Sequence, residues 1–162
     1  LGVRLGADVP VFVRGQTAFA EGIGDQLTPL NLPAAHYFVL HPGVTVSPAG
    51  VFADPHLTRN KPPLTVADFL AEPDCLAPDS RFGNVCEAVA CRQYPVITDA
   101  LNWLSNRVGN SRMTGSGACV FARLASRQEG EHLLASLPVG WKGQLAQGCQ
   151  QSPLHQALAA LK

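Results

Sequence analysis

The chain has 162 residues, 46% of them hydrophobic, and its 12 basic and 12 acidic side chains give a formal net charge of zero. This length and composition predict one compact domain with an appended piece. A chain without a basic excess is not expected to bind nucleic acid, and no apolar run approaches the ~20 residues of a membrane-spanning helix.

The first forty residues predict mainly extended structure. Residues 12–15 have the pattern of a short strand, and residues 16–30 predict extended segments broken by glycine turns. Residues 32–35 are typical of a linker. Residues 36–41 are aromatic and β-branched and end at a Pro-Gly pair, which predicts a buried strand followed by a turn.

Helix signals dominate the middle of the chain. Ser47 before Pro48 marks one helix start, and Thr65 begins a capping box at a second. Over residues 84–108, apolar side chains recur at three- and four-residue steps, as on one face of a helix. Proline inside a helix costs ~3 kcal/mol, so we expect Pro95 to divide this stretch into two helices.

The last third returns to strands. Residues 112–124 predict two strands around a glycine turn, and Ser126 begins a capping box for a helix. Residues 141–149 predict a final strand. Ser152 before Pro153 predicts the cap of a last helix.

The order of these elements predicts the fold class. From about residue 36 to 150 it runs strand, helices, strand, strand, helix, strand, which predicts an α+β fold with the ferredoxin-like split β-α-β arrangement. The preceding residues do not belong to that unit. We therefore divide the chain into residues 1–33, the end of another domain, and residues 34–162, a C-terminal domain. Because Leu1 already lies in a segment with the pattern of folded structure, we expect the chain to be the C-terminal portion of a longer protein.

The cysteines and histidines predict no metal site. The cysteines are odd in number and include no Cys-x-x-Cys pair, which is typical of reduced, mostly buried thiols in a cytoplasmic protein. No two histidines share a predicted helix face. The residues concerned are Cys75, Cys86, Cys91, Cys119 and Cys149, and His36, His41, His56, His132 and His155.

Three features have both a structural and a chemical interpretation. Asp8 is the one ionisable residue in the apolar octad 5–12, where a charge needs partners or a task, but it also suits a helix cap or a turn before Pro10. The Gly115-Ser116-Gly117 loop is either a tight turn with positive φ or a row of N–H groups facing an anion such as phosphate. Phe52 is either a core residue or a surface on which a nucleobase stacks.

Several motifs, taken in order, resemble one family. The octad LGADVPVF at 5–12 and the segment MTGSGACVF at 113–121 are the most specific of them. Between and after these lie Pro42-Gly43-Val44, Val51-Phe52, Asn84 with Glu87, and Ser152-Pro153-Leu154. The chain resembles the 4-diphosphocytidyl-2-C-methyl-D-erythritol kinases, a family within the superfamily of galactokinase, homoserine kinase, mevalonate kinase and phosphomevalonate kinase. The resemblance covers essentially the whole chain.

The resemblance implies a kinase of the non-mevalonate route to isoprenoids. It implies transfer of the γ-phosphoryl group of ATP, with Mg²⁺, to a hydroxyl of a cytidine diphosphate-linked methylerythritol, and it admits a homodimer. Residues 1–33 would then be the end of the ATP-binding kinase domain. By the match, Asp8 is the catalytic aspartate and Phe52 contacts the cytosine. Pro48 and Ala49 lie beside the substrate, and Gly115, Ser116 and Gly117 form the superfamily's third motif.

The sequence departs from the family in three places. It has no Gly- and Ser-rich ATP loop upstream of Asp8, no lysine near Asp8, and Ser47-Pro48 where relatives usually have Ser-Thr. We therefore expect the chain by itself to be catalytically inactive, because positioning supplies most of the rate. Two alternatives remain open: another small-molecule kinase of the same superfamily, and a non-catalytic ferredoxin-like binding module.

Overall fold

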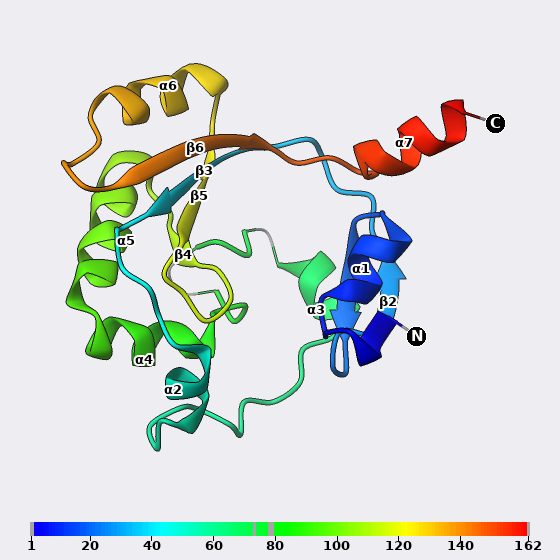
Figure 1. The fold of residues 1–162 in the computed structure, drawn as a ribbon, viewed down its shortest axis with the longest axis horizontal. Helices are drawn as coiled ribbons and strands as arrows, with labels where there is room; N and C mark the ends of the chain where they lie inside the picture. Colours follow the sequence, from blue (N-terminus) through cyan, green and yellow to red (C-terminus); the bar gives the residue numbers. More distant parts are fainter. Residues whose placement is uncertain (1, 73, 78–79, 162) are drawn as a thin grey trace. The chain divides into compact units, whose positions relative to one another are not determined.

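The computed structural model describes residues 2–72, 74–77 and 80–161, and the chain divides into two compact units (Figure 1). The first unit comprises Leu1–Ala34 together with Gly148–Lys162, and the second comprises Ala35–Gln147. The expected division between residues 33 and 34 lies beside this break, but the last helix groups with the first unit. The assignment of 1–33 to a kinase domain stays a prediction.

A four-stranded antiparallel sheet forms the centre of the second unit. Its strands lie in the order β4 (Arg112–Met113), β5 (Val120–Leu124), β3 (His36–His41) and β6 (Lys142–Gln147). The helices between them are α4 (Val85–Gln93), α5 (Pro95–Val108) and α6 (Arg127–Ala135). This connectivity is the ferredoxin-like split β-α-β arrangement, so the predicted α+β fold is confirmed.

One face of this sheet is buried. Phe38 pairs with Ala122 on one side and Leu145 on the other, so the three side chains point to the same face. Trp103 of α5 contacts the Phe38 ring, and a Cβ at Gly130 of α6 would clash with the Leu145 side chain. Helices α5 and α6 therefore cover the same face of the sheet.

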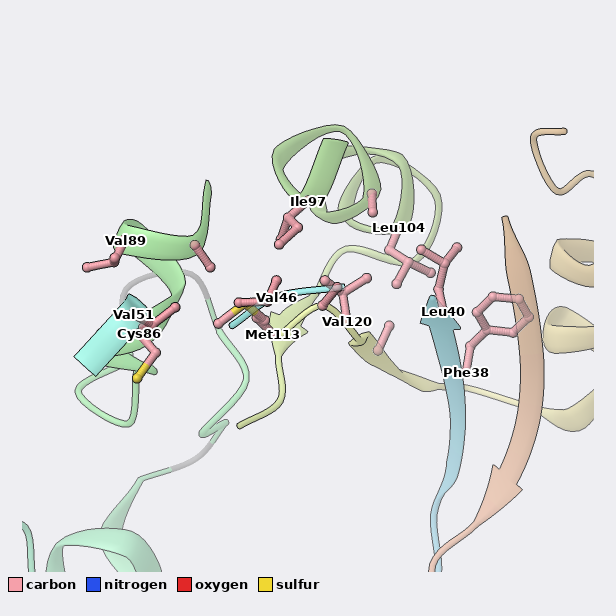
Figure 2. Close-up of a cluster of buried hydrophobic side chains, with 14 of the residues drawn as sticks. Phe38, Leu40, Val46, Val51, Cys86, Val89, Ile97, Leu104, Met113 and Val120 are labelled. Carbon is pink, nitrogen blue, oxygen red and sulfur yellow. The ribbon is translucent and has the colours of Figure 1, made fainter. Parts of the chain in front are cut away.

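The core continues from the sheet to α4 and α2 (Pro48–Ala53) (Figure 2). Each fully buried aliphatic or aromatic side chain contributes about 1.5–3 kcal/mol relative to an exposed one. Pro95 lies at the start of α5, so the predicted division into two helices is confirmed. The labelled side chains of Figure 2 are Phe38, Leu40, Val46, Val51, Cys86, Val89, Ile97, Leu104, Met113 and Val120.

The second unit also contains α3 (Val66–Ala71), which begins with the predicted capping box. The Thr65 hydroxyl accepts from the Asp68 amide, and the Asp68 carboxylate accepts from the Thr65 amide. The rings of Phe69 and Phe82 make a T-shaped contact with centroids 5.5 Å apart, whereas Leu70 is exposed.

The first unit pairs a hairpin with short helices. Strands β1 (Ala18–Glu21) and β2 (Gln26–Pro29) are antiparallel, as expected for glycine-broken extended structure. The other elements are the 3-10 turn η1 (Gly2–Arg4), α1 (Val9–Arg14) and α7 (Pro153–Ala160). Ser152 occupies the N-cap position of α7, although its side chain caps no amide.

The predicted strand at residues 12–15 is wrong, because these residues end helix α1. Pro10 stands in the first helical turn, where its fixed φ suits a helix and its missing N–H costs nothing. Gly15 has a φ of 64°, and its amide donates to the Val11 carbonyl, which ends the helix in the left-handed conformation. Six residues are too few to show the periodicity by which a helix is recognised.

The cysteines agree only in part with the prediction from the sequence. All five thiols are unpaired, but only Cys86 is buried, so the expectation of mostly buried thiols is wrong. No helix among the described residues is long and apolar enough to cross a membrane.

Candidate functional site

Asp8 presents its carboxylate to solvent at the start of α1. The residue occupies the N-cap position in the helical conformation, with φ −84° and ψ −12°, and its side chain makes no hydrogen bond to the helix. The octad therefore does not bury this charge, contrary to the sequence argument, because none of its residues is buried and Leu5, Ala7 and Phe12 are exposed. A carboxylate that is not used as a cap can contact a ligand.

The apolar residues around Asp8 are unusually exposed. Leu5, Phe12 and Val13 keep 80%, 76% and 67% of their surface accessible. Among the described residues, every buried hydrophobic side chain belongs to the second unit. The first unit thus presents apolar surface of the kind that usually packs against further protein.

Helix α2 places two consecutive apolar residues in opposite environments. Val51 is fully buried, whereas Phe52 is 58% exposed. The Ser47 hydroxyl caps the helix by accepting from the Gly50 amide at 3.2 Å, as the sequence predicted. Pro48 and Ala49 are exposed in the first turn. The Phe52 ring is therefore available for stacking and is not a core residue.

Asp54 ties the end of α2 to the end of α4. Its carboxylate lies 3.1 Å from Arg92 Nη2 and 3.0 Å from Gln93 Nε2, and it accepts from the His56 amide at 2.8 Å. The hydrogen bond from the His56 amide, followed by the bonds from Gln93 and His56 and the charge of Arg92, lowers the pKa of Asp54 despite some desolvation. Arg59 adds a bond to the Phe52 carbonyl.

The glycine loop has the geometry that its sequence predicts. Gly115 and Gly117 have φ values of 59° and 100°, the region that glycine alone enters without cost. A Cβ at Gly115 would meet nothing within 4 Å, whereas a Cβ at Gly117 would lie 3.0 Å from Met113 Sδ and 3.3 Å from Val46 Cγ2. Val46 immediately precedes the cap of α2, so the loop and the start of α2 are neighbours.

Two side chains from the first turn of α4 hold the base of this loop. The Asn84 Nδ2 group donates to the carbonyls of Met113 at 2.9 Å and Gly115 at 2.7 Å. Its Oδ1 accepts from the Cys86 amide at 3.0 Å, which caps the helix. Glu87 Oε2 accepts from the Met113 amide at 2.7 Å. The sequence showed both residues only as part of a resemblance, and nothing in it indicated these contacts.

The structure thus brings six of the seven predicted site residues into one unit. Phe52, Pro48 and Ala49 stand on α2, and Gly115, Ser116 and Gly117 form the neighbouring loop, while Asp8 belongs to the first unit. None of the seven lines any of the three hollows that the structure describes. The hollow of about 470 Å³ lies between α5 and α6, and the other two lie in the first unit.

Comparison with known proteins shows what the chain is similar to. The profile described as "GHMP kinases C terminal" matches residues 74–142. The chain is 46% identical to the 4-diphosphocytidyl-2-C-methyl-D-erythritol kinase of Alcanivorax borkumensis, in an alignment that covers 98% of this chain and 51% of the relative. Residues 74–142 thus match the C-terminal domain of the GHMP kinases, and nearly the whole chain is similar to a kinase of that name. The resemblance read from its motifs is confirmed.

Further relatives agree with this similarity. It is 47% identical to the enzyme of the same name from Aromatoleum aromaticum, over 95% of this chain and 51% of the relative. The crystal structure of a 4-(cytidine 5'-diphospho)-2C-methyl-D-erythritol kinase superposes with a TM-score of 0.72 at 26% identity, covering 90% of this chain and 54% of that one. The chain spans about half the length of the curated relatives it matches.

Proposed function

We propose that the protein containing this chain transfers the γ-phosphoryl group of ATP to a hydroxyl of 4-diphosphocytidyl-2-C-methyl-D-erythritol. Support comes from relatives of that name at 44–47% identity. The structural observation that carries the proposal is the exposed Phe52 ring on a helix whose start adjoins the glycine loop. A flat apolar surface beside a row of backbone amides suits a nucleobase joined to phosphates.

Phe52 supplies the base-recognition part of this proposal. Stacking of a base on an aromatic ring contributes ~1–3 kcal/mol and does not require a hydrogen-bond pattern. Because α2 is anchored by buried Val51 and by Asp54, the ring needs little reorganisation on binding. Pro48 at the first helical position has no N–H group, so it offers the substrate no backbone donor.

Asp8 acts, in this proposal, at the substrate hydroxyl that receives the phosphoryl group. Aspartate as a class is a weak base toward an alcohol, but phosphoryl transfer through a loose transition state needs little early proton removal. We infer that Asp8 aligns the substrate hydroxyl and accepts its proton late in the reaction. Its carboxylate is exposed and caps no amide, so it can make this contact.

The donor side of the reaction involves ATP and, in this proposal, Mg²⁺. An exposed carboxylate oxygen together with nucleotide phosphates is the kind of ligand set that Mg²⁺ prefers, and Asp8 offers such an oxygen. When bound, the ion would neutralise charge on the phosphates. Among the described residues, no group of three or more His, Cys, Asp or Glu side chains is suited to hold a metal by itself.

The cellular setting belongs to the same proposal. Five unpaired cysteines fit a cytoplasmic enzyme, since oxidising compartments favour disulfides.

The resemblance also admits a homodimer. Light scattering on the full-length protein tests this, and a measured monomer mass would contradict the homodimer.

The test uses the full-length protein, with ADP formation measured against the cytidine-linked sugar alcohol. We expect Asp8→Asn to lower kcat about 100-fold or more and to leave the melting temperature unchanged, because asparagine suits the N-cap position equally well. CDP should compete with the substrate. If a different small alcohol is phosphorylated and cytidine compounds do not compete, the protein is another GHMP kinase. Unchanged turnover in Asp8→Asn would remove the proposed role of Asp8.

A further inference from the structure

We propose that Asn84 is a positioning residue that holds the glycine loop in its ligand-ready shape, and that this role is separable from its role as the cap of α4. The inference deepens the proposed function and rests on it. The inference is based on three hydrogen bonds that the Asn84 side-chain amide makes at once. Its NH2 group donates to the Met113 and Gly115 carbonyls, and its oxygen accepts from the Cys86 amide.

The hydrogen bonds of the loop's backbone show what Asn84 achieves as a clamp on the loop. The Asn84 side chain donates to the Gly115 carbonyl. Among the described residues, the amides of Gly115 and Ser116 donate to no other group of the chain. The amide of Thr114, by contrast, donates to the Cys119 carbonyl, and that of Gly117 to the Thr114 carbonyl. The neighbouring N–H groups of Gly115 and Ser116 are thus left for a ligand, while the Gly115 carbonyl accepts from Asn84 and the Thr114 carbonyl accepts from Gly117.

Such a loop needs external support. Two of its three central residues are glycines at positive φ, and glycine moves between backbone conformations more easily than any other residue. Donors stabilise developing charge best when their positions are set before the reaction. Asn84 supplies that constraint from a helix whose next turn is buried through Val89 and Ala90.

Glu87 supports the same clamp from the same helix face. It lies three residues after Asn84, so the two side chains are neighbours on α4. Its carboxylate accepts from the Met113 amide, while Asn84 donates to the Met113 carbonyl. Both polar groups of Met113 are therefore held by α4, and its side chain is buried. The base of the loop cannot shift without breaking these bonds.

The experiment separates capping from positioning in the full-length kinase. Asn84→Ser keeps a neutral residue that caps helices well but is too short to reach the two carbonyls. We expect its kcat/KM to fall about 10- to 100-fold, far more than the modest fall in melting temperature that two lost hydrogen bonds would cause. Asn84→Asp also keeps the cap, and its carboxylate faces the same carbonyls without a donor, so kcat/KM should fall at least as far.

The matched control is Ser126→Ala, which removes the cap of α6. The Ser126 hydroxyl accepts from the Glu129 amide within α6, so this variant should melt at a lower temperature with unchanged kcat/KM. If Asn84→Ser retains wild-type kcat/KM, the positioning role is overturned and Asn84 is only a cap. If the wild-type protein itself phosphorylates no cytidine-linked alcohol, the proposed function fails instead, and the two failures are distinguishable.

Discussion

The Asp54 carboxylate lies 3.1 Å from the Arg92 guanidinium, and this ion pair joins the end of α2 to the end of α4. The other end of α4 holds the glycine loop through Asn84 and Glu87. One helix therefore supports both the exposed Phe52 ring and the loop. If the proposed function holds, Asp54→Ala in the full-length protein should raise KM for the proposed cytidine substrate more than it lowers kcat, which steady-state kinetics measures.

The lowered pKa of Asp54 predicts a pH dependence of stability. A carboxyl group whose pKa is lower in the folded state contributes stability above its ordinary value of 3.8, and loses it as the pH falls through the folded pKa. We expect the difference in unfolding free energy between wild type and Asp54→Asn to be constant near neutral pH and to shrink in acid. Urea denaturation at several pH values measures it.

Asp68 provides a parallel for that measurement. Its pKa is also lowered, first by the Thr65 amide and then by the Thr65 hydroxyl. Asp68→Asn should therefore show the same acid trend without any change in KM for the substrate, because α3 carries no predicted site residue. A KM shift in Asp68→Asn as large as that in Asp54→Ala would contradict a specific role for the link between α2 and α4.

Phe52 and Val51 form a matched pair for separating recognition from stability. Truncating the exposed ring in Phe52→Ala should raise KM for the cytidine substrate by about 10-fold or more, since base stacking contributes ~1–3 kcal/mol. Its melting temperature should hardly change. Val51→Ala should instead cost about 2 kcal/mol of stability, because it leaves a cavity in the core. The reverse pattern in calorimetry and kinetics would refute the proposed stacking surface.

The two loop glycines should differ when each is replaced by alanine. At Gly115 the new Cβ meets open space, so the cost is the ~1–2 kcal/mol of a left-handed conformation. At Gly117 the Cβ would also press on Met113 and Val46. We expect Gly117→Ala to lower the melting temperature more than Gly115→Ala does. Equal losses in thermal denaturation would show that the loop adapts.

The isolated 162-residue chain should be inactive and should bind hydrophobic dyes. Its first unit leaves Leu5, Phe12 and Val13 exposed, and its described residues bury no hydrophobic side chain there. At equal molar concentration, dye fluorescence should be higher with the isolated chain than with the full-length protein. ATP turnover by the isolated chain at an ordinary enzyme rate would contradict the expectation that half of the positioning lies elsewhere.

The sequence by itself determined the elements whose causes are local. Caps at Ser47 and Thr65, the proline that divides residues 84–108, and the aromatic and β-branched run of β3 each act within a few residues, so they could be recognised in order along the chain. The glycine loop belongs with them, since only glycine enters its backbone conformation readily.

Tertiary structure decided which face each residue presents and what it contacts. The exposure of Asp8 and Phe52 depends on packing by distant segments, and at residues 12–15 the end of the short helix α1 stands where a strand was expected. The clamp by Asn84 joins positions 31 residues apart, and its bonds go to backbone carbonyls, which every residue possesses. Such a contact leaves no signature in residue types, so it is visible only once the chain is folded.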